Sequence, residues 1–245
     1  MANHVEIVRQ EGVEEIIFDR ADKKNALTLQ MYSDAAAALE QASESKEVRC
    51  VLISGRGGHF TSGNDLMDFM QNPPTDESSP VFRFLLALRG CSCPVVAAVD
   101  GYAIGIGTTM LLHCDLAWTA KEAKFRMPFV DLGLVPEAGS SVVLPAMAGH
   151  RKAAELLYFS DFFDAEVAED VGLVNGIVDG DVADFARERV QRLAEKPPQA
   201  LRLTKQLLRQ SDDKAVLEAM HKEAELFVER LQSPEFMEAV ANFQS

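Results

Sequence analysis

The 245-residue sequence is poor in several features that mark particular classes of protein. No apolar run approaches the roughly 18 residues that a membrane-spanning helix needs, and residues 1–10 contain no apolar segment typical of a signal peptide. Basic residues are few: 24 Lys and Arg stand against 38 Asp and Glu, a net charge of −14. This charge disfavours nucleic-acid and anionic-membrane partners, although local basic groups and backbone amides can still bind a small anion. We therefore expect no nucleic acid and no membrane among the partners.

Cysteine is also scarce, with four in the chain. Cys50 and Cys114 lie in apolar contexts and are expected to be small buried hydrophobic residues. Cys91 and Cys93 form a C-x-C pair, but no second pair at metal-binding spacing accompanies them, so a zinc site is not expected. The sequence predicts no metal, no cofactor and a reduced, cytoplasmic setting.

The remaining composition, 47% hydrophobic and 25% charged residues, is that of a soluble globular protein with one large domain or one domain and an appendage. Hydrophobic patterns predict strands at residues 4–9, 13–18, 48–54, 94–99, 115–120 and 123–126, and helices at 28–43, 80–89, 140–148 and from about 107 to 113. Strands that alternate with glycine-rich loops and helices predict stacked strand–strand–helix units with a largely buried sheet.

The end of the chain has a different pattern. No strand pattern remains after residue 181, and helices are predicted at 181–195, 199–210, 213–231 and 234–243. The Pro197-Pro198 pair marks a joint, so we divide the chain into residues 1–195 and a helical module at residues 196–245. The composition of residues 71–79 predicts a mobile surface loop.

Three motifs contain the candidate functional residues: FTSGNDL at 60–66, DGYAIGIG at 100–107 and VDLGLVPEAGSS at 130–141. The first two place small residues where a strand gives way to a helix, so free backbone N–H groups at the helix start can face an anion. In the third, Glu137 stands among apolar and small residues. An arbitrary loop glutamate is usually exposed, but one that points inward is poorly solvated, which raises its pKa and makes it a better base near neutral pH.

In this order and spacing, the motifs resemble those of the crotonase (enoyl-CoA hydratase/isomerase) superfamily. FTSGNDL is similar to the family's F-x-A-G-x-D-[IL] segment and DGYAIGIG to its G-x-[AC]-x-G-x-G segment. DRADKKNALT at 19–28 resembles the family's R-P-x-x-x-N-A-[LF] loop, with Ala21 where proline is usual. The resemblance covers essentially the whole chain. It implies an α/β fold, a spiral of ββα units with a C-terminal helical trimerisation module, an acyl-CoA thioester substrate, and a homotrimer or a dimer of trimers.

The resemblance also assigns site residues. It implies an oxyanion hole in which the backbone N–H groups of Ser62 and Ile106 bind the thioester oxygen. Contacts with the substrate or its CoA are implied for two sets of residues, one in the N-terminal loop and one in the first two motifs: Lys24, Asn25, Ala26 and Leu27; Phe60, Gly63, Asp65, Leu66 and Gly105. Of these, Asp65 is expected to hold the loop or cap the following helix rather than act as a base. Phe129, Leu132 and Leu134 are expected to be walls of the acyl pocket.

The number and the positions of the catalytic glutamates distinguish the possible reactions of the family. Hydratases of the family carry two glutamates, whose positions correspond here to Thr109 and Phe129. Neither side chain can activate water, and one carboxylate is a poor substitute for a pair. Glu137 instead occupies the position of the catalytic glutamate of peroxisomal-type Δ3,Δ2-enoyl-CoA isomerases, whose P-E-G-C-S-S segment reads P-E-A-G-S-S here.

The working hypothesis is therefore an enoyl-CoA isomerase that moves a C3–C4 double bond to C2–C3, with Glu137 as the single base acting through an enolate held in the oxyanion hole. Two alternatives stay open. One is a hydratase with a rearranged site, in which Asp131 is the first candidate for a second acid, or another enolate-forming acyl-CoA enzyme of the superfamily. The other is a non-catalytic acyl-CoA-binding trimer.

Overall fold

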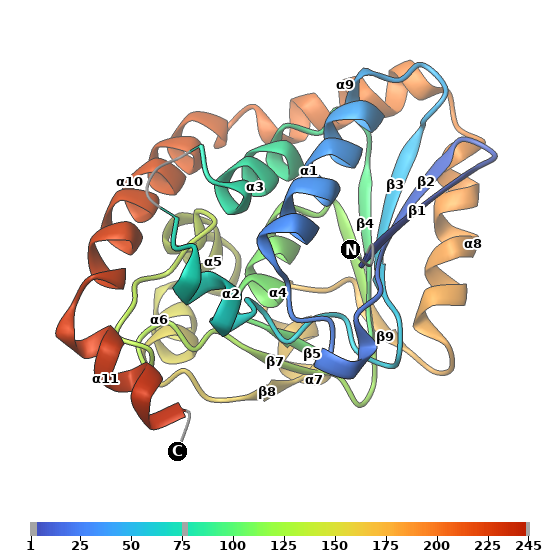
Figure 1. The fold of residues 1–245 in the computed structure, drawn as a ribbon. Coiled ribbons are helices and arrows are strands. Elements are labelled where there is room, and N and C mark those ends of the chain that lie inside the picture. The colour runs from blue at the N-terminus through green and yellow to red at the C-terminus, as the bar shows by residue number, and fades with distance from the viewer. Residues whose placement is uncertain (1–3, 75–77, 244–245) are drawn as a thin grey trace.

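A six-stranded sheet forms the centre of the computed structural model, which describes residues 4–74 and 78–243 (Figure 1). Its strands lie in the order β1-β2-β3-β4-β6-β9, and only the β1–β2 pair is antiparallel. The bounds are β1 Val5–Gln10, β2 Val13–Phe18, β3 Cys50–Gly55, β4 Val95–Val99, β6 Leu116–Ala120 and β9 Gly176–Val178.

A second, three-stranded sheet lies beside the first. It contains β5 (Tyr102–Ile104), β7 (Lys124–Arg126) and β8 (Phe163–Asp164) in the order β5-β7-β8. β5 directly follows β4 and β7 directly follows β6, so each pair of consecutive strands contributes one strand to each sheet before a helix returns the chain. The predicted α/β fold of repeated ββα units is confirmed.

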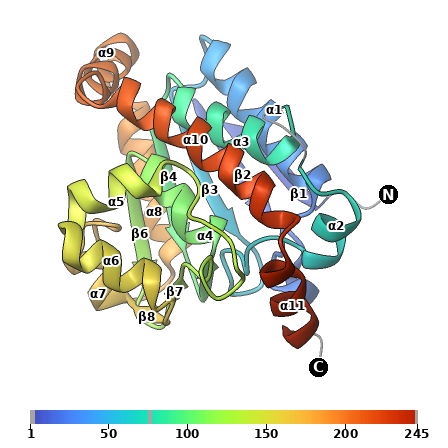
Figure 2. The same ribbon diagram turned by 90° about the vertical axis from the view of Figure 1, so that its left-hand side faces the viewer.

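Helices cover and bury both faces of the large sheet. α1 (Leu29–Glu44) and α3 (Pro80–Gly90) pack together on one face, and α8 (Val182–Ala194) packs against the other (Figures 1 and 2). The strands therefore carry apolar side chains on both sides: Val51 and Ile53 of β3 join the larger core, whereas Cys50 and Leu52 join the cluster under α8. A strand buried on both faces is continuously apolar, which explains why these strands are predictable from short apolar runs.

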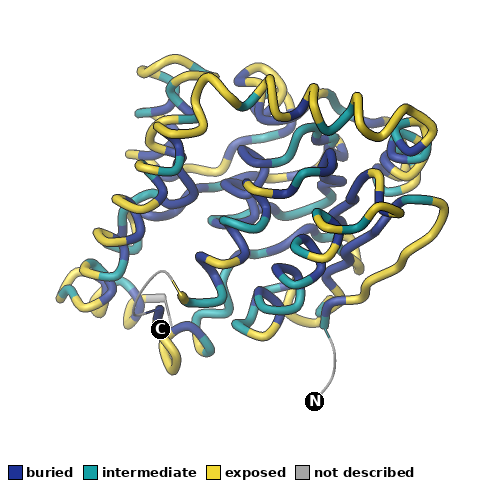
Figure 3. Tube along the Cα trace, turned by 90° about the horizontal axis from the view of Figure 1, so that it is seen from above, coloured by how far each residue is buried: buried dark blue, intermediate teal, exposed yellow. Residues whose placement is uncertain are grey.

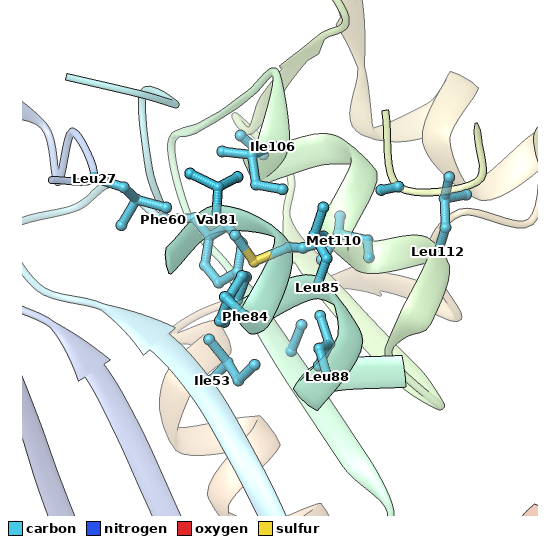
Figure 4. Packing of buried hydrophobic residues seen from close by; sticks show 14 of the residues in the cluster. Leu27, Ile53, Phe60, Val81, Phe84, Leu85, Leu88, Ile106, Met110 and Leu112 are labelled. Atoms are coloured by element: carbon cyan, nitrogen blue, oxygen red, sulfur yellow. The ribbon is translucent and has the colours of Figure 1, made fainter. Parts of the chain in front are cut away.

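The larger core anchors the first two motifs. Phe60 and Ile106 lie among Val81 and Leu85 of α3 and Met110, all of them buried (Figure 4). Packing at these side chains fixes the backbone of the two strand-to-helix turns that contain Ser62 and Ile106.

Several short elements were not predicted. They are the 3-10 helix η1 (Ala21–Lys23), α2 (Leu66–Gln71), α6 (His150–Tyr158), α7 (Ala165–Asp170), β5, β8 and β9. Most of them have six residues or fewer, too short for a helical or strand period to stand out. α2 includes the first residue of the predicted mobile loop at 71–79, of which residues 75–77 lie outside the described residues. The segment from 107 to 113, predicted as one helix, is α4 (Ile106–Thr109) followed by the 3-10 helix η2 (Met110–His113). α5 (Ser140–Ala148) is helical as predicted.

The last three helices are α9 (Pro198–Arg209), α10 (Asp213–Leu231) and α11 (Pro234–Phe243), and α10 packs against α5 (Figure 2). α9 is unusual because its inward side is basic. Lys205 is buried and bonds Asp115 (2.7 Å) and the Cys93 carbonyl (2.6 Å), while three leucines of α9 are exposed. That residues 196–245 form a separate module stays a prediction.

Burial follows this layered arrangement: the inner strands of the sheet are dark, whereas the edge strand β1 and the outer helix faces are largely exposed (Figure 3). None of the helices in the described part of the chain has both the length and the apolar character needed to cross a membrane. The four cysteines are free thiols.

The loop that precedes α1 is fixed by the side chain of Asn25. Asn25 is fully buried in the left-handed region, with φ of +56°. Its Oδ1 accepts from the N–H of Arg20 (2.8 Å), and its Nδ2 donates to the carbonyls of Arg56 (2.9 Å) and His59 (2.6 Å). The side chain thus joins residues 20–26 to the glycine-rich loop after β3.

We expect Asn25→Ala to lower the free energy of unfolding by about 2 kcal/mol or more, because three backbone groups lose the partner that this buried side chain supplies and alanine disfavours a positive φ. Urea unfolding measures this. Lys23→Ala, at an exposed position of the same loop, should change it by less than about 0.5 kcal/mol. Equal effects of the two variants would contradict this role for Asn25.

Candidate active site

Backbone hydrogen bonds bring the first two motifs side by side. The N–H of Thr61 donates to the carbonyl of Tyr102 (2.8 Å), and the N–H of Ile104 donates to the carbonyl of Thr61 (3.1 Å). The approach requires glycine at 107, because a Cβ there would lie 2.6 Å from Cγ2 of Thr61 and 3.1 Å from its carbonyl oxygen. The turns that contain Ser62 and Ile106 are therefore held next to each other.

The two predicted oxyanion donors differ in their hydrogen bonding. The N–H of Ile106 is the first of α4 and has no acceptor among the described residues. The N–H of Ser62 donates to the carbonyl of Lys24 (2.9 Å). No local pattern predicts this bond, which leaves one of the two predicted donors free among the described residues.

A cavity of about 410 Å³ opens beside these turns. Nine residues predicted for the site line it: Lys24, Ser62, Gly63, Leu66, Gly105, Ile106, Phe129, Leu132 and Leu134. Aromatic side chains from distant segments add to the lining, namely Phe69 of α2, Phe227 of α10 and Phe236 of α11. Phe69 and Phe227 meet edge to face, with ring centroids 6.2 Å apart. The cavity is thus apolar over most of its wall, as an acyl chain requires.

Two cations also line the cavity. Lys24 Nζ lies 4.7 Å from the ring centroid of Tyr102, and the Arg126 guanidinium lies 5.0 Å from that of Phe162. Arg126 is further held by the Ser160 carbonyl (2.6 Å) and by Asp131 (2.6 Å). In an acidic protein, these groups provide local positive charge at the cavity.

Five other residues predicted to contact the substrate or CoA do not line the cavity: Asn25, Ala26, Leu27, Phe60 and Asp65. Asn25, Leu27 and Phe60 are buried in the fold. Asp65 caps α2, accepting from the N–H groups of Met67 (3.1 Å) and Asp68 (3.0 Å), and pairs with Arg20 (2.6 Å). Burial tends to raise the pKa of Asp65, but the Asp68 N–H and Arg20 together lower it. Its expected capping role is confirmed.

Glu137 is buried, with 3% of its surface exposed. It does not line this cavity, although Leu134, three residues earlier in the chain, does. Instead it borders a void of about 10 Å³ with Leu85, Leu86 and Met220. Among the described residues, its one side-chain hydrogen bond is long, 3.4 Å from Thr109 Oγ1 to Glu137 Oε1.

The surroundings of Glu137 raise its pKa from the ordinary value of 4.5 to about 8. Burial is the largest cause, the charge of Glu223 on α10 adds to it, and the hydrogen bond from Thr109 opposes it. Tyr32 of α1 is also close enough to interact with Glu137, and burial with that charge raises the pKa of its phenol. A carboxyl with a pKa near 8 can take and return a proton close to neutral pH.

The loop around Glu137 has an uncommon backbone. Ala138 (φ +63°) and Gly139 (φ +67°) are consecutive residues in the left-handed region. His113 of η2 contacts the Ala138 carbonyl through Nε2 (2.6 Å), and Ser140 Oγ donates to the Glu137 carbonyl (2.6 Å). These contacts from a neighbouring element and from α5 maintain the conformation.

The positions of the two hydratase glutamates are apolar or neutral here. In the described part of the chain, Thr109 is the one side chain that hydrogen-bonds the Glu137 carboxyl, and Phe129 is a wall of the cavity. Asp131 is 42% exposed and bonds Arg126; within the described residues no hydrogen bond joins it to Glu137. In residues 4–74 and 78–243, no group of three or more His, Cys, Asp or Glu side chains is placed to hold a metal ion.

Several residues at the site were missed by the sequence analysis. Tyr102 and Asn64 belong to two of the recognised motifs, so the sequence did contain a signal for both. Asn64 also accepts a hydrogen bond at Oδ1 from the Tyr32 hydroxyl (2.5 Å). Phe69, Phe162, Phe227, Phe236 and Glu223 had no such signal, because each reaches the site through long-range packing.

The sequence matches the family "Enoyl-CoA hydratase/isomerase" over residues 8–244. Enoyl-CoA delta isomerase 2 of Rattus norvegicus is 33% identical over 97% of this chain, which spans 62% of the length of that relative. A probable enoyl-CoA hydratase of Rhodobacter capsulatus is 32% identical over 95% of this chain and 91% of its own length. The solved structure of OdaA from Pseudomonas aeruginosa superposes with a TM-score of 0.96 at 44% identity, covering 99% of each chain.

The chain is therefore a crotonase-fold protein, and it belongs to the enoyl-CoA hydratase/isomerase family. The resemblance inferred from the motifs is confirmed. Both isomerase and hydratase names occur among the relatives.

The raised pKa of Glu137 predicts a pH-dependent stability. The folded chain holds this proton more tightly than the unfolded chain, so the stabilisation is fully present below pH 4.5 and is lost as pH rises through about 8. Glu137→Gln cannot ionise. We expect its free energy of unfolding to gain about 2–4 kcal/mol relative to wild type between about pH 5 and pH 9.

Urea unfolding at a series of pH values measures this difference. Glu122→Gln, which removes an exposed carboxylate, should follow the wild-type curve in parallel. A difference between Glu137→Gln and wild type that stays constant with pH would show that the Glu137 carboxyl titrates normally.

Proposed function

We propose that the protein is a Δ3,Δ2-enoyl-CoA isomerase that moves a C3–C4 double bond of an acyl-CoA thioester to C2–C3. The observation that carries this proposal is the buried carboxyl of Glu137, with Thr109 and Phe129 at the two positions where a hydratase of the family has its acids. Isomerisation needs one group that takes a proton and returns it, and needs no water.

In the proposed reaction, Glu137 removes a proton from C2, which the thioester and the C3–C4 double bond both acidify. The electron pair moves into a dienolate whose oxygen accepts hydrogen bonds from the N–H groups of Ile106 and Ser62. Each such donor is typically worth about 3 kcal/mol in related acyl chemistry. Glu137 then protonates C4, which leaves the conjugated 2-enoyl thioester. No cofactor takes part.

Two local changes accompany substrate binding in this proposal. The Ser62 N–H has to be shared with or released by the Lys24 carbonyl, which accepts it in the free protein. The Glu137 carboxyl has to turn from its small void towards the cavity wall formed by Ile106 and Leu134. Lys24 and Arg126 provide charge for the CoA phosphates, and the aromatic wall receives the acyl chain.

We also propose that the chain assembles as a homotrimer, which is free to pair into a hexamer, through the helical module at 196–245. The supporting observation is the surface of α9, where Leu203, Leu207 and Leu208 are 49%, 69% and 76% exposed while the basic side bonds the protein's own sheet. Three leucines on one exposed helix surface are typical of an interaction site. A cytoplasmic location stays part of the proposal.

The isomerase proposal predicts fast conversion of 3-hexenoyl-CoA to 2-hexenoyl-CoA and little hydration of crotonyl-CoA by one purified sample. Glu137→Gln should lower kcat by about 10²- to 10⁴-fold, because the base is lost while the pocket is unchanged. For wild type, kcat/KM should rise with pH with a midpoint near 8 and level off above it, since only ionised Glu137 accepts the proton.

Asp131→Asn is the matched control, because it removes a nearby carboxylate that does not contact Glu137. It should keep the isomerase activity within a few-fold of wild type. Dominant hydration that disappears in Asp131→Asn would instead establish a rearranged hydratase, and the absence of both activities with retained acyl-CoA binding would establish a non-catalytic binder.

The trimer proposal predicts a solution mass near three or six times the 26.9 kDa of one chain by light scattering. Leu207→Lys combined with Leu208→Lys should shift the mass towards one chain, because charges replace the apolar contact. Glu188→Lys on α8 is the surface-charge control. A wild-type mass of one chain, or an unchanged mass in the double variant, would contradict this use of α9.

A further inference from the structure

A second carboxylate lies beneath the Glu137 loop and is not explained by the proposed chemistry. Glu223 of α10 is only 6% exposed. Its Oε2 accepts from the N–H of Gly139 (2.6 Å), and its Oε1 accepts from the N–H (2.9 Å) and the hydroxyl (2.5 Å) of Ser141. All three contacts are donors and favour the ionised carboxylate, although burial has the larger effect and raises the pKa of Glu223.

We propose that Glu223 is a positioning residue for the catalytic loop: it fixes the backbone just after Glu137 and places a negative charge that holds the proton on Glu137 between turnovers. The proposal rests on the proposed function for its consequence in turnover, but not for its geometry.

The geometric part follows from how α5 begins. Its first N–H groups need acceptors, and the residue before it, Gly139, has no side chain to supply one. Glu223 supplies the missing cap from a helix 84 residues later in the chain. Because Ala138 and Gly139 both have positive φ, the loop adopts this path only while such contacts hold it. The direction of the Glu137 side chain therefore depends on α10.

The electrostatic part depends on what else faces the loop. The titratable groups around it are Tyr32 from α1, His113 from η2, and His221 and Glu223 from α10. Burial lowers the pKa of His113 to about 3, so this ring is neutral. The Glu223 charge opposes ionisation of Glu137 and raises its pKa.

The test compares Glu223→Gln with Glu225→Gln, which removes an exposed carboxylate two residues further along the same helix. Two readouts are followed in each. One is the pH profile of kcat/KM for 3-hexenoyl-CoA. The other is the infrared band of the protonated Glu137 carboxyl, taken as the difference between each protein and its Glu137→Gln partner, and titrated without substrate.

In Glu223→Gln we expect the midpoint of the Glu137 band to fall by about half a pH unit or more, since a like charge is removed. The low-pH limb of the activity should move in the same direction. We also expect kcat to fall about tenfold or more with little change in KM, because the amide retains one acceptor and the base is less well oriented. Glu225→Gln should match wild type in both readouts.

An unmoved midpoint in folded Glu223→Gln would overturn the proposal and leave Glu223 a purely structural cap. If this variant does not fold, Glu223→Asp replaces it, because aspartate retains the charge but withdraws it by one methylene. Glu223→Asp should lower both the midpoint and kcat by less than we expect for Glu223→Gln. An unchanged midpoint in Glu223→Asp also overturns the proposal. Because the infrared titration needs no turnover, a chain without isomerase activity would refute the proposed function while the band still decides the role of Glu223.

Discussion

The burial of one carboxyl group with no strong hydrogen-bond donor is the constraint on which the rest of the site depends. An ionised carboxylate loses its hydration when it is buried, and the single long contact from Thr109 replaces little of it. The proton therefore stays on Glu137 until the pH or the substrate changes the balance. A group that holds and releases a proton near neutral pH is what a reversible proton shuttle requires.

The buried position of Glu137 depends on contacts from distant parts of the chain. The two left-handed residues after Glu137 are held by His113 from η2 and by Glu223 from α10. η2 is in turn tied to α9, because Arg209 donates to the His113 carbonyl (2.6 Å) and pairs with Asp115 (3.0 Å). The sheet, the loop and the C-terminal helices thus form one connected support, in which the helices after residue 196 contribute to the site as well as to the surface.

The sequence is informative where local chemistry decides the structure. The strands buried on both faces, the long helices and the glycine turns at 60–66 and 100–107 each have a local pattern, so their places follow from the residues themselves. It is silent where the outcome depends on packing between distant segments. Nothing near Glu223 or Phe227 distinguishes them from other residues of an amphipathic helix, and the bond from Ser62 to the Lys24 carbonyl depends on how two loops meet. For the same reason, the sequence did not predict that Asn25, Leu27 and Phe60, all in matched motifs, are buried in the fold and do not line the cavity.

The balance between isomerisation and hydration follows from what stands near the acid. Hydration needs a group to activate water and a group to protonate C2, placed to serve two different atoms. Here the first position is a threonine that donates to the acid and the second is a phenylalanine in an apolar wall. Water in such a wall has few polar partners, so it is poorly held. In the proposed isomerisation, the proton that leaves C2 and returns to C4 is carried by one carboxyl and needs no water. The scarcity of polar groups around Glu137 makes its ionised form unfavourable. The same scarcity favours the proposed isomerisation, which needs only one acid–base group.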